Sequence, residues 1–116
     1  MKLISNGMKK IKFYPELAEL IRAGKKSTTW RLFDDKNIQK GDQLTFTVTG
    51  TGEVFGEAVI TDMQVRTLGT LTDEDWDGHE RFSSPEEMYT TYQGYYDREV
   101  DENTEVKILK FDFSAK

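Results

Sequence analysis

The strongest constraint on the fold is a β-hairpin pattern near the middle of the chain. Apolar and polar residues alternate over residues 43–49, which is the two-residue period of a half-buried strand. A glycine-containing turn at residues 50–52 leads into a second predicted strand over residues 53–65, in which Gly56 is a candidate β-bulge. The pattern predicts an antiparallel sheet as the centre of the fold.

Short helices and further strands are predicted on both sides of the hairpin. Pro15 suits the first turn of a helix whose apolar residues recur at helical spacing until Gly24 stops it. A second helix begins after Ser83 or Ser84 and ends at Gly94. A short acidic helical turn is predicted at residues 72–77. Three more strands are predicted at residues 11–13, 27–31 and 106–113. We expect an α+β fold of about five to six mostly antiparallel strands with two or three short helices, compatible with a small β-barrel.

Length and composition indicate a single domain. The 116 residues are enough to bury a hydrophobic core. No cysteine is present, so disulfides, thiolate catalysis and cysteine zinc sites are excluded. No apolar run approaches the roughly 20 residues of a membrane span, and residues 1–8 contain no secretory hydrophobic region. We expect a cytoplasmic protein without a membrane partner, for which a monomer is plausible, with residues 1–8 as a loose lead-in and residues 9–113 as the domain.

The charge is divided unevenly along the chain. Residues 1–41 carry a net charge of +6 and residues 42–116 one of −11, which together give −5. Such asymmetry is compatible with an anionic ligand at the basic part and is also common in ordinary proteins. The overall negative charge argues against tight non-specific binding to nucleic acid, because that affinity comes mostly from phosphate neutralisation.

The most basic of the predicted strands concentrates the reactive side chains. Side chains alternate along a strand, so Thr29 and Arg31 should share one face while Trp30 and Leu32 point into the core. Lys26 would lie at the start of this strand, which brings an ammonium, a hydroxyl and a guanidinium close together. The pattern alone favours an ordinary half-buried strand with a solvated basic face over a site.

Several common site motifs are absent. The central glycines do not fit GxGxxG, and no helix follows them. Residues 73–78 resemble the start of an EF-hand loop, but Ser84 occupies the position of its bidentate glutamate, so a solvated acidic turn is favoured over a calcium site. His79, the only histidine, lacks the partners of a zinc site and fits either a general base or a surface residue. We predict no metal and no cofactor.

Four tyrosines lie in or next to the second helix, at positions 89, 92, 95 and 96. Their rings could stack on nucleobases. Tyrosines at helical spacing are more often core or rim residues. The tyrosine-rich, acidic part of the chain also leaves open a non-catalytic protein-interaction module.

The chain contains the groups needed for amide hydrolysis. A threonine hydroxyl becomes a nucleophile only when a base takes its proton, and a desolvated lysine near other cations can have its pKa lowered enough to be that base. Lys26 lies close to Lys25 and Arg31 in the sequence, and a carboxylate such as Glu80 could orient it or pass a proton to a leaving group. The sequence alone does not place Glu80 against Lys26.

The residues GKKSTTWR at 24–31, followed by Lys40-Gly41-Asp42, resemble the signature of the ASCH domain family. Residues 68–72 and the segment GHERFS at 78–83 also fit, so the resemblance spans residues 9 to 113. The G-x-K-x-x-T-x-R core is short and becomes specific only with the downstream G-D and E-x-F elements in order. ASCH domains are PUA-like β-barrels with flanking helices, and the resemblance implies that fold here.

The resemblance also implies two functions. ASCH domains are similar to PUA domains and are widely proposed to bind RNA, whereas some small bacterial members are amidohydrolases that remove the acetyl group from N4-acetylcytidine. The catalytic lysine, threonine and glutamate of those enzymes would be Lys26, Thr29 and Glu80. Asp77 is a rival for Glu80, because the alignment needs a one-residue insertion between them. Trp30 replaces a smaller aliphatic residue of the characterised amidohydrolases.

We therefore predict a cleft that binds RNA or a modified nucleoside, with amide hydrolysis and a protein-interaction module as the alternatives. The predicted catalytic residues are Lys26, Thr29 and Glu80, and the predicted ligand-binding residues are Lys25, Trp30, Arg31 and Tyr92.

Overall fold

The structure is a computed structural model in which residues 9–116 are described. The lead-in predicted for residues 1–8 lies outside these residues. The elements, in chain order, are β1 (Lys9–Phe13), α1 (Pro15–Arg22), β2 (Thr28–Leu32), β3 (Gln43–Val48), β4 (Val54–Thr67), the 3-10 turn η2 (Leu68–Thr70), α2 (Asp73–Trp76), α3 (Pro85–Tyr96) and β5 (Glu105–Ala115).

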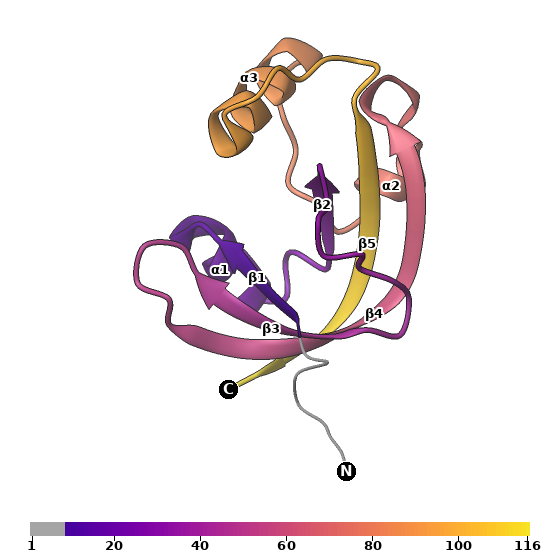
Figure 1. Cartoon of the computed structure of the whole chain (residues 1–116). Coiled ribbons are helices and arrows are strands. Elements are labelled where there is room, and N and C mark those ends of the chain that lie inside the picture. Colours follow the sequence, from indigo (N-terminus) through magenta and orange to yellow (C-terminus); the bar gives the residue numbers. More distant parts are fainter. Residues whose placement is uncertain (1–8) are drawn as a thin grey trace.

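The strands form one curved sheet in the order β1-β3-β4-β5-β2. β1 runs parallel to β3, and the other neighbouring strands are antiparallel. The long strands β4 and β5 bend together, so the sheet curls into a half-barrel whose two edges are β1 and β2 (Figure 1). The predicted α+β class with mostly antiparallel strands and short flanking helices is confirmed.

The helices begin at the predicted residues, and one ends later than expected. Pro15 opens α1, and Ser84 caps α3 by accepting a hydrogen bond from the Glu87 N–H. The prediction that α3 ends at Gly94 is wrong. The helix continues to Tyr96 because Asp97, with φ of 52°, takes the left-handed conformation that ends it. Aspartate is one of the few residues besides glycine that adopts this conformation readily.

The predicted bulge at Gly56 is present. Phe46 pairs with Gly56 and Thr47 with Val54, so β4 carries one extra residue beside this glycine. A Cβ atom on Gly56 would lie 2.4 Å from the ring of Phe113 and 2.5 Å from the Ser114 carbonyl oxygen. The glycine is required because β5 approaches β4 closely at this point.

Two hydrophobic clusters lie along the sheet. The first packs the buried face of α1 against one end of the half-barrel, and the second packs α3 against the other end. β5 contributes to both, because Ile108 belongs to the second cluster and Leu109 to the first. Trp30 and Leu32 lie in the second cluster, which confirms that they point into the core.

The acidic segment at residues 73–77 exposes three of its four carboxylates, as expected for a solvated turn, and Asp75 is the exception. Asp75 is only 2% exposed, and its carboxylate accepts hydrogen bonds from Arg66 Nε at 3.0 Å and from the Thr72 N–H at 2.9 Å. The Asp75 carbonyl accepts a bond from Trp30 Nε1 at 3.1 Å. Asp75 therefore ties α2 to both β4 and β2. Within residues 9–116, no group of three or more metal-ligating side chains is close enough to hold an ion.

The helices described for this chain are short. None of those within residues 9–116 combines the length and apolar character needed to cross a membrane.

Candidate functional site

A glycine fastens the segment after α2 to the start of β2. Gly78 has a φ of +80°, and a Cβ atom there would lie 2.3 Å from Ser27 Oγ. Its carbonyl accepts hydrogen bonds from the main-chain N–H groups of Ser27 at 2.9 Å and Thr28 at 3.1 Å. Only glycine combines this conformation with so close an approach. Residues 79 and 80 are therefore held against β2.

Lys26 and Glu80 form a buried ion pair at this junction. Lys26 is 2% exposed, and its Nζ donates to Glu80 Oε1 at 2.5 Å and to the Thr28 carbonyl at 2.8 Å. Burial lowers the pKa of Lys26, because the apolar surroundings disfavour the ammonium, and Glu80 acts in the opposite direction. The structure thus brings together two predicted catalytic residues that are 54 positions apart in the chain.

Asp77 does not take the place of Glu80. It is exposed, and its main-chain carbonyl accepts a hydrogen bond from Thr28 Oγ1 at 2.6 Å. Among residues 9–116, the carboxylate that bonds to Lys26 belongs to Glu80.

His79 is buried, contrary to the expectation of a surface residue. The residue is 6% exposed, and its ring stacks on the ring of Trp30 with the centroids 3.8 Å apart. Nδ1 lies 2.7 Å from the Glu80 carbonyl, which can only accept, so Nδ1 carries the proton and Nε2 accepts a long bond from Tyr92 Oη at 3.4 Å. Burial and the nearby Lys26 hold the pKa of His79 well below its usual range. The ring is therefore neutral and fixes the main chain of Glu80.

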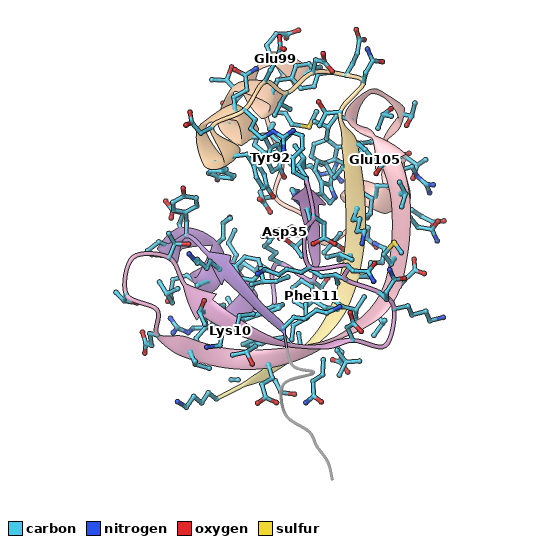
Figure 2. All side chains as sticks on the ribbon, in the orientation of Figure 1. Lys10, Asp35, Tyr92, Glu99, Glu105 and Phe111 are labelled. Atoms are coloured by element: carbon cyan, nitrogen blue, oxygen red, sulfur yellow. The ribbon has the colours of Figure 1, made fainter. Side chains whose placement is uncertain are left out.

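A cleft of about 640 Å³ opens between β1 and α3, at the gap between the two edges of the sheet. Figure 2 shows Lys10 on β1 and Tyr92 on α3 on opposite sides of this opening. Ligand pockets in proteins commonly measure about 300–1,000 Å³, so the cleft can take a small molecule or part of a larger one. The polar residues that line it are Lys10, Lys12, Thr29, Arg31, Asp35, Lys36, Thr47, Thr49, His79 and Glu80.

Thr29 and Arg31 both line the cleft, as predicted for one face of β2. No hydrogen bond joins the Thr29 hydroxyl to Lys26 or to another described residue. Arg31 Nε is buried without a partner within residues 9–116, and no ion pair there involves this side chain. An unbonded buried donor costs about 1–3 kcal/mol, which a ligand oxygen placed beside Arg31 would recover.

The other predicted ligand-binding residues differ in position. Trp30 and Tyr92 border the cleft from the second hydrophobic cluster and are 3% and 4% exposed. Lys25 is exposed and is not among the residues that line the cleft. Of the tyrosines proposed for an interaction surface, Tyr95 is 40% exposed, whereas Tyr92 is too buried to be offered to a protein partner.

Comparison with solved structures identifies the fold. Models of protein families and curated proteins gave no match to this sequence. The hypothetical protein PH0355 is 25% identical, with a TM-score of 0.69, over 92% of this chain and 99% of its own. The ASCH domain from Lactobacillus crispatus JV V101 gives a TM-score of 0.68 at 14% identity, over 95% of this chain and 81% of its own. ASCH from Zymomonas mobilis gives a TM-score of 0.65 at 16% identity, over 91% of this chain and 67% of its own.

The chain has the ASCH-domain fold. The PUA-like half-barrel implied by the motif at residues 24–31 is therefore confirmed. In this fold, the motif's threonine lies in the edge strand β2 and its lysine lies two residues before that strand. The glutamate of the downstream motif bonds to this lysine.

Part of the cleft was not predicted from the sequence. Lys10 and Lys12 project from β1, and Tyr14 follows them at the rim, where its ring packs on Tyr95 with the centroids 4.8 Å apart. The alternation of lysine with Ile11 and Phe13 was a usable signal, since it places both lysines on the polar face of a strand.

Proposed function

We propose that the cleft binds RNA or a modified nucleoside. The observation that carries this proposal is the presence, in one cleft, of exposed aromatic rings and of cations that have no carboxylate partner within residues 9–116. The rings of Tyr14 and Tyr95 are exposed at the rim of the cleft. The guanidinium of Arg31, on β2, lines the same cleft without a partner among residues 9–116. Aromatic side chains stack on unpaired bases, and guanidinium groups bind phosphate or carbonyl oxygens.

The charges of the cleft suit this ligand better than the net charge of the chain does. Four lining residues are cationic and two are acidic, and one of the acidic residues, Glu80, is already paired with Lys26. The lining cations are Lys10, Lys12, Arg31 and Lys36. If all four met phosphates, log K would fall with log salt at a slope of about −2.8, since each single-strand contact contributes about −0.7.

A titration with matched lysine variants tests this proposal. The native protein is titrated with cytidine, uridine and a short single-stranded RNA at several salt concentrations. Lys36→Ala removes a cleft cation and should weaken RNA binding and flatten the salt slope by about 0.7. Lys40→Ala, an exposed lysine outside the cleft lining, is the control and should change neither. Absence of binding, or equal losses in both variants, would contradict the proposal.

A second candidate function is hydrolysis of the linear amide of an acylated nucleoside. The observation that favours it is the buried Lys26, whose pKa is lowered and whose partner Glu80 lines the same cleft as Thr29. A lysine with a lowered pKa has a larger neutral fraction near pH 7, and only the neutral amine accepts a proton.

In this reaction the Thr29 oxygen would attack the amide carbonyl carbon while its proton passes to Lys26. The carbon–nitrogen bond then breaks, and the leaving amine takes a proton from Lys26 or Glu80. Water hydrolyses the resulting threonyl ester and releases the acid. Because Thr29 makes no bond to Lys26 here, the hydroxyl has to turn toward the amine when substrate binds.

A hydrolysis assay with two threonine variants tests this candidate. N4-acetylcytidine is incubated with protein, and released cytidine is measured by chromatography. Thr29→Val should abolish turnover, whereas Thr49→Val, a second threonine of the cleft, should retain it. Lys26→Met should reduce turnover by about 100-fold or more. Unchanged turnover in Thr29→Val would exclude this mechanism.

A further inference from the structure

The main-chain groups of β2 point alternately toward β5 and away from it. Within an antiparallel pair, the N–H and C=O of one residue face the same side, and the next residue faces the other side. The Ser27 carbonyl accepts from the Phe111 N–H of β5, so the odd-numbered residues of β2 bond to β5. Thr28, Trp30 and Leu32 therefore turn their main-chain groups to the free edge of the sheet.

Two of these three outward residues already have partners. The Thr28 N–H donates to the Gly78 carbonyl, and its carbonyl accepts from Lys26 Nζ. The Leu32 N–H donates to Tyr96 Oη at 3.2 Å. These bonds confirm the outward direction deduced from β5, and they close the free edge at both ends.

Trp30, between them, is left open. Within residues 9–116, no hydrogen bond reaches its main-chain N–H or C=O on the outward side, and Trp30 lines the cleft together with Glu80 and Tyr96. Its indole is held in the second hydrophobic cluster, stacked on His79 and bonded to Asp75. The main chain of Trp30 is thus a fixed donor and acceptor at one point of the cleft.

The length of this open edge decides what can bind there. A peptide that adds a strand to a sheet edge needs outward groups on several alternate residues. Here the outward main-chain groups of Thr28 and the outward N–H of Leu32 already have hydrogen-bond partners. Only Trp30 has both its N–H and its C=O available among the described residues of β2. A planar ligand with a donor and an acceptor on neighbouring atoms needs no more than one such pair.

We infer that the main-chain N–H and C=O of Trp30 bind the Watson–Crick edge of a nucleobase, and pyrimidines serve as the probes. Uracil would donate N3–H to the Trp30 carbonyl and accept at O4 or O2, and cytosine would donate N4–H and accept at N3. The inference rests on the proposed nucleoside function and adds which atoms read the base. It assigns Trp30 a recognition role through its main chain, whereas its side chain packs in the core.

The test uses base analogues instead of a Trp30 substitution, which would disrupt the core. Nitrogen-15-labelled protein is titrated with cytidine and uridine and with two analogues of each. 3-Deazacytidine and 3-methyluridine lose the N3 function. 5-Methylcytidine and 5-methyluridine keep it and carry their change on another edge. Parent and 5-methyl nucleosides should shift the Trp30 amide resonance and slow its hydrogen exchange, and the N3-altered ones should bind at least tenfold more weakly.

The outcomes separate this inference from the proposed function. If Thr29 and Tyr95 resonances respond but the Trp30 amide does not, and the N3-altered analogues bind equally well, the inference is overturned and nucleoside binding stands. If no cleft resonance responds to any nucleoside or to a short pyrimidine RNA, both fail together. A Trp30 response to an extended hexapeptide, and not to nucleosides, would overturn the inference in favour of strand addition.

Discussion

Replacing Glu80 by glutamine should destabilise the protein through Lys26. The Lys26 side chain is 1% exposed and Glu80 is 19% exposed, so the ammonium depends on this carboxylate for its charge partner. Glu80→Gln keeps the size of the side chain and removes the charge. Removing one member of a buried pair typically costs about 3–5 kcal/mol, because the remaining charge is left uncompensated.

The pKa of lysine sets an upper limit on this loss. The variant can always release the Lys26 proton, and keeping a group of pKa 10.5 neutral at pH 7 costs about 4.8 kcal/mol, at 1.36 kcal/mol per unit. At pH 9 the same limit falls to about 2 kcal/mol. Because the folded-state pKa of Lys26 is lowered, its penalty is greatest at low pH and disappears as pH rises toward 10.5. We expect a loss of about 3 to 4.8 kcal/mol at pH 7 and of no more than about 2 at pH 9.

Urea unfolding at pH 7 and pH 9 measures both values. The control is Glu19→Gln, which breaks the Arg22 pair on the surface of α1, where the Glu19 side chain is 70% exposed. It should change stability by less than about 1 kcal/mol. Lys26→Met combined with Glu80→Gln should recover most of the loss, since no buried charge remains. A loss in Glu80→Gln that is equal at the two pH values would refute the argument, because the cost would not come from the ammonium.

Three further predictions concern other parts of the fold. Gly56→Ala should lower the free energy of unfolding by about 1–3 kcal/mol, because its Cβ would lie 2.4 Å from Phe113. A Cβ on Gly94, inside α3, would have no neighbouring atom within 4 Å, so Gly94→Ala should raise the free energy of unfolding by about 0.5–1 kcal/mol in the same urea measurement. Ser84→Ala should cost about 1 kcal/mol through the lost cap of α3, and restoration by Ser84→Asp would confirm that cause. His79 should stay neutral through pH 6 in a proton NMR titration, and stability should fall as pH drops below 6.5, by at most about 1.4 kcal/mol per unit, because the unfolded chain takes up the proton first. A His79 titration near pH 6.5 would show instead that the ring is solvated.

Local patterns were sufficient for most elements of the fold. The alternation at residues 43–49 and the turn after it specify the β3–β4 hairpin, because strand period and turn chemistry depend only on neighbouring residues. The end of α3 was misplaced for the opposite reason. Glycine is a common helix stop, but here packing of Tyr96 on Tyr92 and Phe33 extends the helix past Gly94. Tertiary contacts outweigh a single glycine.

The candidate site was only partly accessible to sequence reasoning. The resemblance gave the residue pair Lys26 and Glu80, but no local pattern tells which of two nearby carboxylates reaches a lysine. That choice depends on the Gly78 carbonyl, which holds the segment at β2. His79 looked like a surface residue because its neighbours are polar, and its burial comes from Trp30, far away in the chain. The lysines of β1 were overlooked because their strand lies across the cleft from the motif.

Among the described strands, β2 pairs only with β5, so the site cannot form before β5 has been synthesised. Thr28 lies opposite Lys110, a residue 82 positions later, and no other strand of the described sheet borders β2. At a translation rate of about 5–20 residues per second, the motif strand emerges about 4–16 s before its partner. Through that interval Lys26 and Arg31 belong to an unpaired segment. The cleft residues contributed by β2 therefore cannot take their final positions until β5 has been made.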